Sequence, residues 1–346
     1  MALPALCDII TNLMALRERL LGLLDDFPKR KLIVVGDLIA DEFLYGQISR
    51  VSREAPVLVL DYRNLMRLLG GAANAANNLV DLGCRVVVAG VVGEDEAGQN
   101  LLETMKLKGA DIGLVRKPKR YSTPIKTRIL AGAHHSSRQQ VVRVDRGAPL
   151  DRNSQPPWTA LERRIEGSDG IILSDYDYGV VTPELLERIR HLARRMSIPL
   201  VVDSRFRMAE FKGVTSITPN ITELEAAVGV RIGGDLKLLR KIGRRVLRKQ
   251  QLDCLLVTQG RFGMTLFQPR RAPIHIPVFG GDEVADVTGA GDTVIAVFTL
   301  ALSCGGTPEE AARLANYAGG IVVMKRGTAT VTRGELGAAL RDDLPS

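Results

Sequence analysis

A short segment in the last quarter of the chain combines a tight turn, a helix start and a carboxylate. It runs from Asp286 to Asp292 with the sequence Asp-Val-Thr-Gly-Ala-Gly-Asp. Its two glycines permit backbone angles and a close ligand approach that side chains would prevent. The apolar run from Thr293 to Leu302 predicts a buried helix, whose first N–H groups would favour an anion such as a phosphoryl group. Asp292 could then accept the proton of an attacking hydroxyl, although a plain turn with an acid at a helix start would have the same sequence.

Length and composition limit the class of protein. The 346 residues suffice for one large α/β domain or two smaller ones, and 45% hydrophobic with 25% charged residues is typical of a soluble globular protein. Lys and Arg exceed Asp and Glu by 47 to 39, which suits a protein that handles phosphorylated small molecules and also a nucleic-acid binder. The four cysteines lie far apart, so we expect neither a zinc site nor a disulfide framework, and a cytoplasmic location.

The N-terminal segment and the hydropathy pattern bear on membrane association. Met1 to Phe27 contains acidic, basic and amide side chains among its apolar residues and lacks the basic start of a signal peptide. We therefore expect an amphipathic helix there, within residues 1–30. No uninterrupted apolar stretch reaches the length of a membrane span, so no membrane partner is expected.

Strands that end on polar residues alternate with helices in the first half of the chain. Lys31 to Gly36 is an apolar, β-branched run followed by Asp37, which could accept hydrogen bonds from sugar hydroxyls or serve as a cap. Gly70 to Asn74 opens a helix that extends to about Asp81, and its small residues allow a ligand to come close to the backbone. Arg85 to Val92 is the next strand, so this order predicts a parallel sheet.

The segment from Thr123 to Asp145 has the alternation of an exposed antiparallel ribbon. Its cations either protect an edge strand or bind an anion. These cations are Lys126, Arg128, Arg138 and Arg143. His134 and His135 are adjacent and would point to opposite faces of a ribbon, so we predict no metal site there.

Two further segments could contact a nucleotide. Asn220 and Glu223 stand three residues apart at a predicted helix start, where both could face one ligand or could form a helix cap. Thr258 to Gly263 is a glycine turn between two strands, suited to phosphates or to a simple hairpin. A predicted helix from Leu236 to Lys249 has one strongly basic face. A solvated face explains it, and nucleic-acid binding is a weak alternative because no aromatic residues interleave.

The end of the chain and the domain organisation complete the prediction. Pro308 to Met324 predicts a helix rich in small residues, and Gly337 to Ser346 is expected to fray. Neither an internal repeat nor a low-complexity linker divides the sequence. We therefore expect a single domain over residues 1–346, with a lid inserted from two separate segments.

Taken in order, these motifs resemble those of the ribokinase (PfkB) family of sugar kinases over about Lys31 to Leu340. Four elements carry the resemblance: Gly70 to Asn74, Asn220 to Glu223, Thr258 to Gly260, and Gly289 to Asp292. The resemblance implies a ribokinase-like three-layer α/β/α sandwich with a mostly parallel central sheet. It also implies a small β-lid from about residues 38–62 and 123–145, through which two subunits would form a homodimer.

The resemblance implies roles for individual residues as well. Asp292 would be the catalytic base, and Gly289, Ala290 and Gly291 would form an anion hole. The sugar would be held by Asp37, Gly70, Gly71, Asn74 and Arg143. ATP would be bound by Asn220, Thr258, Gly260 and Asn316. Glu223 would organise Mg²⁺ through the bound ATP, and the family places a monovalent cation such as K⁺ near Asp286.

Within the family, Ser49 to Val57 and Val142 to Asp145 resemble the D-glycero-β-D-manno-heptose 7-phosphate kinase branch. That branch phosphorylates the anomeric C1 hydroxyl to form the 1,7-bisphosphate for ADP-heptose and lipopolysaccharide core synthesis, and its bifunctional members carry an adenylyltransferase domain after the kinase. Tyr178 and Arg205 stand where the branch usually has lysines, which changes the groups that could bind a phosphate. The alternatives are another kinase of the family, acting on ribose, fructose or adenosine, and a nucleic-acid-binding protein.

Overall fold

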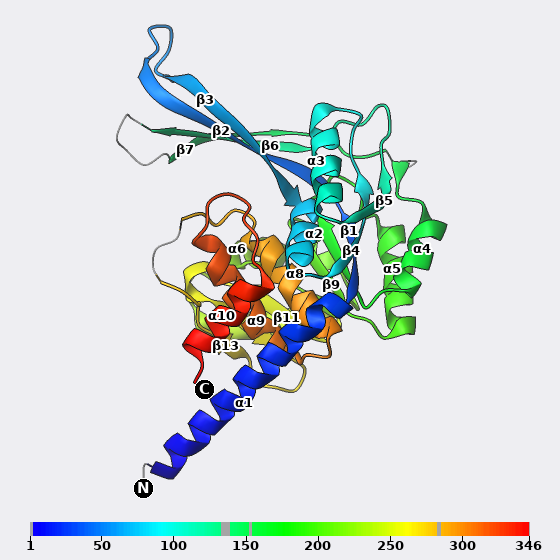
Figure 1. Ribbon diagram of the computed structural model, residues 1–346, viewed down its shortest axis with the longest axis vertical. Coiled ribbons are helices and arrows are strands. Elements are labelled where there is room, and N and C mark those ends of the chain that lie inside the picture. The colour runs from blue at the N-terminus through cyan, green and yellow to red at the C-terminus, as the bar shows by residue number, and fades with distance from the viewer. Residues whose placement is uncertain (1–2, 133–138, 152–153, 282–284, 346) are drawn as a thin grey trace.

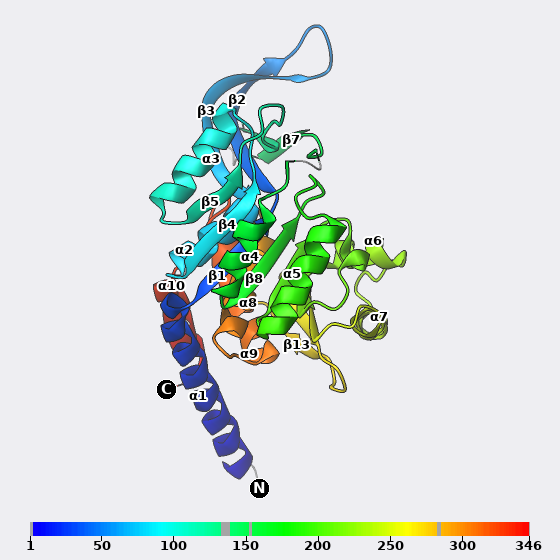
Figure 2. The ribbon, with the colours of Figure 1, turned by 90° about the vertical axis from the view of Figure 1, so that its right-hand side faces the viewer.

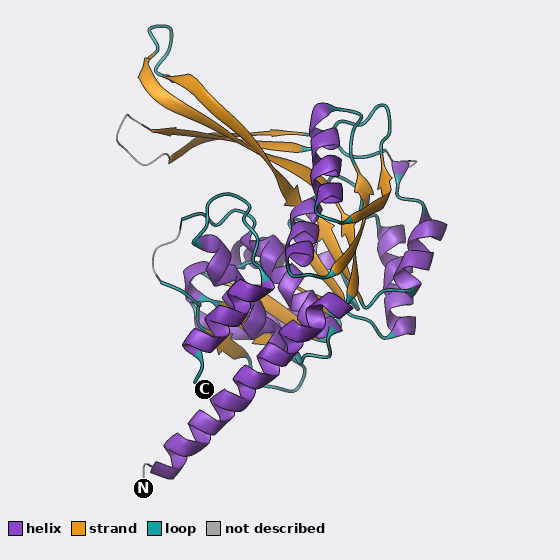
Figure 3. Cartoon of the chain, in the orientation of Figure 1, coloured by secondary structure: helices purple, strands orange, loops and turns teal. Residues whose placement is uncertain are grey.

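The computed structural model describes residues 3–132, 139–151, 154–281 and 285–345, with side chains from Thr11 onward. The chain forms a nine-stranded sheet and a separate four-stranded sheet, with helices on both faces of the larger one (Figure 1; Figure 3). Within the described residues, no helix is long and apolar enough to cross a lipid bilayer.

The nine-stranded sheet is parallel except at one edge. The strands lie side by side in the order β13-β12-β11-β10-β9-β8-β1-β4-β5. Only the two pairings of β12, with β11 and with β13, are antiparallel. The strands are β1 (Lys31–Gly36), β4 (Arg85–Val91), β5 (Asp111–Arg116), β8 (Gly170–Asp175), β9 (Leu200–Ser204), β10 (Ser216–Ile217), β11 (Cys254–Thr258), β12 (Met264–Phe267) and β13 (Ile274–Ile276). Because parallel strands need crossover connections, both faces of this sheet are covered by helices.

The side chains of β1 show how the two faces are built. Leu32 and Val34 pack into one hydrophobic core, whereas Ile33 and Val35 pack into the other. One face carries α1 (Leu3–Asp26), α2 (Ala72–Asp81), α3 (Glu96–Leu107), α8 (Ala290–Ser303), α9 (Pro308–Val323) and α10 (Arg333–Asp343). The other carries α4 (Trp158–Glu166), α5 (Pro183–Met196), α6 (Ile221–Val228) and α7 (Leu236–Lys249). The three-layer sandwich predicted from the sequence is therefore confirmed.

The four-stranded sheet is the predicted lid. It consists of β2 (Leu38–Val51), β3 (Leu58–Gly71), β6 (Ile125–Gly132) and β7 (Gln139–Arg146), in the order β3-β2-β6-β7. Figure 2 shows that it extends from one end of the main body. Since β6 lies between β2 and β7, the interpretation of Lys126 and Arg128 as guards of an edge strand is wrong. The residues His134 and His135 lie outside the described part of the chain.

The expected fraying after Gly337 is also wrong, because this glycine lies inside α10. A capping box begins the helix, with the Thr332 hydroxyl accepting from the Glu335 backbone N–H and the Glu335 carboxylate accepting from that of Thr332. Leu336 and Leu340 are fully buried against the rest of the fold. The Thr-x-x-Glu spacing was a signal in the sequence that could have predicted this helix and was overlooked.

Candidate active site

The turn before α8 has the geometry that the sequence predicted. Gly289 is the N-cap residue, with a φ of 79° that suits glycine and strains other residues. A Cβ atom added there would lie 2.6 Å from the Asn74 amide nitrogen. A Cβ added at Gly291 would meet no atom within 4 Å, so the space beside this residue is open. The Ala290 N–H donates to the Val287 carbonyl oxygen at 3.3 Å, so the next N–H groups, those of Gly291 and Asp292, are the ones that a ligand in front of the helix could reach.

Asp292 lies in the first turn of α8 and is almost fully buried. Its Oδ2 atom accepts a hydrogen bond from Asn74 Nδ2 at 2.8 Å, and its Oδ1 atom accepts one from the Tyr176 hydroxyl at 3.1 Å. The pKa of Asp292 is raised to about 7, mainly by burial. The Asp41 carboxylate contributes to this rise, while the two hydrogen bonds and the Lys126 ammonium oppose it. A carboxyl with this pKa can take up a proton near neutral pH.

Asp292 borders a cavity of about 370 Å³, so its carboxylate is buried without being sealed in the core. We call this space the lid cavity, because the lid and the carboxyl edge of the main sheet both line it. The lid supplies Asp41, Gly71, Lys126 and Arg128. The main body supplies Tyr176, Asp203, Arg205, Thr218, Asn220, Glu223, Thr258, Val287, Thr288, Gly289, Gly291 and Asp292.

Cations of the lid cavity come from both the lid and the main body. The Lys126 ammonium lies 4.1 Å from the centre of the Tyr176 ring and forms no ion pair with the described residues. Its burial lowers the pKa of Lys126 to about 8. Arg128 forms an ion pair with Asp41 on the neighbouring strand. Arg205 also faces this space without an ion pair in the described part of the chain, so the cavity offers Lys126 and Arg205 to an anionic ligand.

Carboxylates of the same cavity lie near the end of β9 and the start of α6. Burial raises the pKa of Asp203 well above its usual value, and the nearby Glu223 carboxylate raises it further. Burial likewise raises the pKa of Glu223. Among the described residues, no group of three or more acidic, histidine or cysteine side chains could hold a metal ion by itself. This arrangement fits Mg²⁺, which usually binds through one or two carboxylates, water and substrate phosphates.

A second cavity, of about 470 Å³, adjoins the first. Asn220 and Thr258 line both spaces, so ligands in the two cavities would meet at these side chains. We call the second space the outer cavity. Its other lining residues are Ile221, Thr222, Gly233, Gly234, Leu236, Gln259, Gly260, Phe262 and His275. The predicted nucleotide residues Asn220, Thr258 and Gly260 are thus brought together by the fold.

The helix-cap interpretation of the Asn220 to Glu223 segment is confirmed, and the contact of both side chains with one ligand stays a prediction. The Asn220 side chain accepts from the Glu223 backbone N–H at 2.9 Å, and the Glu223 carboxylate accepts from the Asn220 backbone N–H at 2.9 Å. This capping box begins α6, and both residues also line the lid cavity. The cap therefore holds the two side chains at the place where the cavities meet.

Asp37 and Asn74 lie beside the lid cavity rather than among the residues that line it. The Asp37 carboxylate accepts backbone N–H groups from Tyr176, Tyr178 and Val180 at 2.8 to 3.2 Å. It therefore anchors the loop that carries Tyr176. Asn74 is fully buried and donates to Asp292. Both residues position other groups in this structure, and their direct contact with a sugar stays a prediction.

Gly70 and Gly71 allow the lid to lie close to the main body. A Cβ added at Gly70 would collide with the Asp41 carboxylate. Gly71 has a φ of 55°, and a Cβ there would lie 2.8 Å from the Asp37 carbonyl oxygen. The two glycines thus leave room for an acidic side chain and for the backbone around the cavity.

Like Asp37, Gly70, Asn74 and Ala290, three further predicted residues line neither cavity. Arg143 forms an ion pair with Asp145 at 2.9 Å on β7. Asn316 donates to the Pro277 carbonyl oxygen at 2.7 Å. Asp286 accepts the backbone N–H groups of Thr288 at 2.9 Å and Gly327 at 3.1 Å, which joins two loops. Their proposed roles in sugar, ATP and K⁺ binding stay predictions.

Sequence reasoning missed Asp41 and Tyr176 as site residues. Asp41 follows Asp37 by four residues in extended backbone, where residues two or four apart share a face. That spacing was a usable signal. Tyr176 follows the strand end at Asp175, but its contact with Asp292 spans 116 positions and has no local signature.

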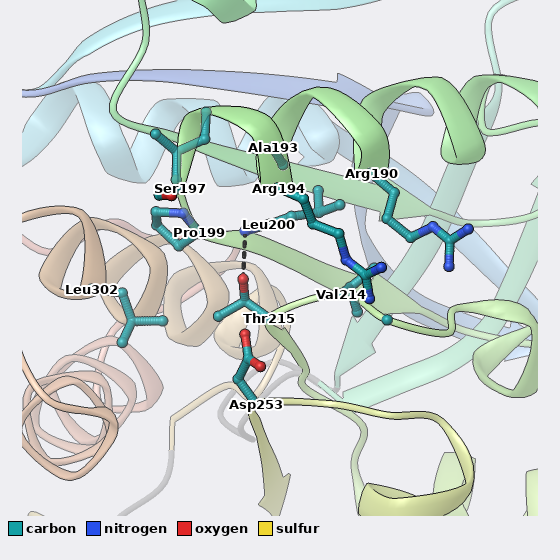
Figure 4. A pocket seen from close by; sticks show the side chains of 12 residues that line it. Arg190, Ala193, Arg194, Ser197, Pro199, Leu200, Val214, Thr215, Asp253 and Leu302 are labelled. Atoms are coloured by element: carbon teal, nitrogen blue, oxygen red, sulfur yellow. Dashed lines mark hydrogen bonds between the residues drawn. The ribbon is translucent and has the colours of Figure 1, made fainter.

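A different cavity, of about 400 Å³, is shown in Figure 4. It lies where β9 and β11 begin, at the end of these strands away from the lid cavity. It is bordered by the first residue of β9, Leu200, and by Asp253, which precedes β11. Asp253 is its one carboxylate, and Arg194 faces it from α5. This cavity lacks the helix start, the paired carboxylates and the strand ends found around Asp292, so we place the candidate active site at the carboxyl edge.

Comparison with known proteins agrees with this geometry. The model of the pfkB family carbohydrate kinases matches residues 29–333. The bifunctional protein HldE of Geobacter metallireducens is 44% identical over 313 residues, which cover 88% of this chain and 61% of that protein. HldE of Geobacter sulfurreducens is 44% identical over 318 residues, which cover 89% of this chain and 62% of that protein. The chain thus spans less than two thirds of the length of these relatives.

Solved structures show the same fold. Arabidopsis thaliana ribokinase complexed with ribose and ATP has a TM-score of 0.71 at 18% identity, with 90% of this chain and 99% of that one covered. Escherichia coli phosphofructokinase-2 in complex with substrates and products has a TM-score of 0.72 at 18% identity, with 90% and 98% covered. The chain therefore belongs to the pfkB family of carbohydrate kinases and is a phosphotransferase that acts on a sugar hydroxyl.

Proposed function

We propose that the chain transfers the γ-phosphoryl group of ATP to the anomeric C1 hydroxyl of D-glycero-D-manno-heptose 7-phosphate, forming the 1,7-bisphosphate. The main support is the position of Asp292, a buried carboxyl with a pKa of about 7, beside a cavity that adjoins a second one. The sugar phosphate would occupy the lid cavity and ATP the outer cavity. The resemblance to the heptose branch and the 44% identity to HldE proteins support this choice of sugar.

Asp292 would act as the general base in this reaction. It would take the proton of the C1 hydroxyl as the oxygen attacks the γ-phosphorus atom, and the bond from phosphorus to the β,γ-bridging oxygen would break to release ADP. The backbone N–H groups between Gly289 and Gly291, with the positive end of α8, would stabilise charge on the transferred group. Asn74 and Tyr176 would hold the carboxylate in place through their hydrogen bonds.

Lys126 and Arg205 would bind the 7-phosphate of the sugar. Both cations line the lid cavity and form no direct ion pair in the described structure. Lys126 is buried, and a buried cation that is not directly paired favours an anionic ligand. Lys126 comes from the lid, so its contact with the phosphate would couple lid closure to the presence of a phosphorylated sugar. This pair would compensate for Tyr178, which stands where the branch usually has a lysine.

Glu223 and Asp203 are the side chains suited to organise Mg²⁺ near the phosphates, because both are acidic and line the lid cavity. A bound Mg²⁺ would neutralise part of the phosphate charge. The K⁺ proposal rests on Asp286, whose oxygens each accept one backbone N–H and retain a second lone pair.

A homodimer through the lid is part of the proposal. Apolar side chains on the lid are exposed, which is unusual for a surface that stays in water. They are Val51, Val57, Leu58, Tyr62, Met66, Val141, Val142 and Val144. A second copy of the lid would cover them. A cytoplasmic location and the lack of nucleic-acid and membrane partners also remain predictions.

The experiment is a substrate panel followed by ADP release. It compares the heptose 7-phosphate with the unphosphorylated heptose, ribose, fructose and adenosine at fixed Mg-ATP. We expect the highest kcat/KM for the heptose 7-phosphate. Preference for an unphosphorylated substrate would contradict the proposal and would favour the second candidate, another sugar or nucleoside kinase of the family. The changed residues Tyr178 and Arg205 are the observation that supports this alternative.

A further inference from the structure

The exposed face of α7 is strongly basic and lacks counter-ions. We call its seven cations the α7 patch: Lys237, Arg240, Lys241, Arg244, Arg245, Arg248 and Lys249. All seven are exposed, and none forms an ion pair with another described residue. A solvated helix usually pairs some of its charges with acids three or four positions away. This helix contains no acid with which to do so.

The α7 patch accounts for nearly all of the net charge of the chain. Without its seven cations the total of 47 Lys and Arg residues falls to 40, against 39 Asp and Glu residues. The remaining sequence is thus close to neutral. The helix itself carries seven cations and no acidic residue within 14 residues.

Tight packing holds the α7 patch toward solvent. A Cβ added at Gly243 would overlap the Phe267 ring, so the helix lies very close to β12. Leu239, Ile242 and Val246 are buried beneath it. The helix therefore cannot rotate about its own axis to bury its charged side chains. Figure 2 shows it at the outer side of the molecule.

The start of α7 adjoins the outer cavity. Leu236, its first residue, and Gly233 and Gly234 before it line that cavity. The helix has 14 residues and so extends about 21 Å. The Debye length is about 8 Å at physiological ionic strength, so charges on the first two turns act on the cavity with partial screening. At low ionic strength the whole patch would act on it.

The groups in the lid cavity supply only part of the electrostatic attraction on an approaching nucleotide. It contains the carboxyl groups of Asp41, Asp203, Glu223 and Asp292, which outnumber its three cations Lys126, Arg128 and Arg205. These carboxyl groups reduce the attraction that the three cations exert on a nucleotide, which carries several negative charges. An external cationic surface beside the outer cavity would add to that attraction during approach.

We propose that the α7 patch steers the anionic nucleotide into the outer cavity. This inference rests on the proposed use of that cavity by ATP. The patch increases the association rate through its field and does not contact the reacting atoms, so it acts on kcat/KM for ATP and not on kcat. Its effect decreases as salt screens the field.

The test removes three charges from the helix and three from a distant site. The first variant is Lys237→Gln, Lys241→Gln and Arg244→Gln. Glutamine is a good helix former, so α7 should persist. The matched control is Lys117→Gln, Lys119→Gln and Arg120→Gln. These exposed cations follow β5, at the opposite edge of the sheet and about 29 Å from β11, as estimated from six strand spacings.

Two measurements are made from low to high ionic strength. One is kcat/KM for ATP, and the other is the stopped-flow association rate of a fluorescent ATP analogue. At about 20 mM salt we expect the α7 variant to lose roughly threefold to tenfold in both, with kcat and the dissociation rate unchanged. Above about 0.5 M salt the difference from the unmodified protein should disappear. The control should match the unmodified protein.

Three outcomes would overturn the inference. They are an equal loss in both variants, an unchanged salt dependence in the α7 variant, and a loss expressed in kcat or in the dissociation rate. The proposed function fails separately, if the unmodified protein binds the analogue but phosphorylates no sugar. In that case the association rates still decide whether the patch steers nucleotides.

Discussion

The hydrogen bond from Tyr176 to Asp292 makes a quantitative prediction for the variant Tyr176→Phe. The substitution removes one hydroxyl and keeps the ring that packs against the Lys126 ammonium. The lost donor had favoured the ionised form of Asp292, so the pKa of this carboxyl should rise above its present value of about 7. Other groups that face Asp292 are Asn74, Asp41, Asp203 and Lys126, and they are the same in both proteins.

The magnitude follows from the geometry. A hydrogen bond to a charged group contributes about 1.5–3 kcal/mol, and the 3.1 Å separation places this one near the lower limit. Since 1.36 kcal/mol corresponds to a tenfold change, the pKa of Asp292 should increase from about 7 to about 8. The ionised fraction at pH 7 would fall from about one half to about one tenth, so kcat would fall about fivefold. At pH 9 the two proteins should differ by only about 10%.

The assay is the pH dependence of kcat between pH 6 and 9, with saturating ATP and sugar. Comparing the two proteins at each pH cancels the titration of Lys126, which both contain. Tyr178→Phe is the matched control, because its hydroxyl forms no hydrogen bond with the described residues. A loss of kcat that is the same at every pH would refute the reasoning, as would an unchanged profile.

Three further perturbations test the site and the fold. Asp292→Asn should lower kcat by about 10²-fold or more with little change in ATP affinity, as measured by ADP release and nucleotide titration. The pKa of Asp292 is raised from 3.8 to about 7, so the stability that its protonated form contributes is complete below pH 3.8 and is lost as pH rises through 7. Urea unfolding should therefore show Asp292→Asn gaining stability relative to the unmodified protein from pH 4 to 8, and a constant difference would contradict this. Lys126→Met should raise KM for the sugar phosphate at least tenfold but leave that for an unphosphorylated sugar nearly unchanged, and equal increases would exclude a phosphate contact. Gly243→Ala should lower the free energy of unfolding by about 1–3 kcal/mol because its Cβ would overlap Phe267, whereas Gly234→Ala, with no atom within 4 Å of the added Cβ, serves as the urea-unfolding control.

Local elements could be predicted from the sequence because their signals lie within a few residues. The helix start at Ala290 lies between two glycines and precedes an apolar run. The boundaries of α7 follow from the regular spacing of its apolar and basic residues. Even the overlooked helix α10 has a capping box that the sequence displays. Hydrophobic periodicity and helix capping depend on residues that are close in the sequence. Each helix or strand can therefore be predicted from its own segment alone.

The roles of the carboxylates around the site required the tertiary structure. The sequence singled out Asp37 as a sugar ligand and not Asp41, yet Asp37 anchors a loop and Asp41 lines the lid cavity. Asn74 contacts Asp292 across 218 positions of the chain. Such contacts depend on which strands become neighbours and on how the lid lies over the sheet.

The sequence by itself therefore determined most of the helices and strands, the order of the motifs and the turn that holds Asp292. Tertiary structure alone decided that Asn74 and Tyr176 orient this carboxylate, and that Lys126 faces the same cavity from the lid. The physical reason is the range of the interactions. Backbone geometry and hydrophobic period act between near neighbours, whereas burial, hydrogen bonding and the pKa of Asp292 depend on groups that only folding brings together.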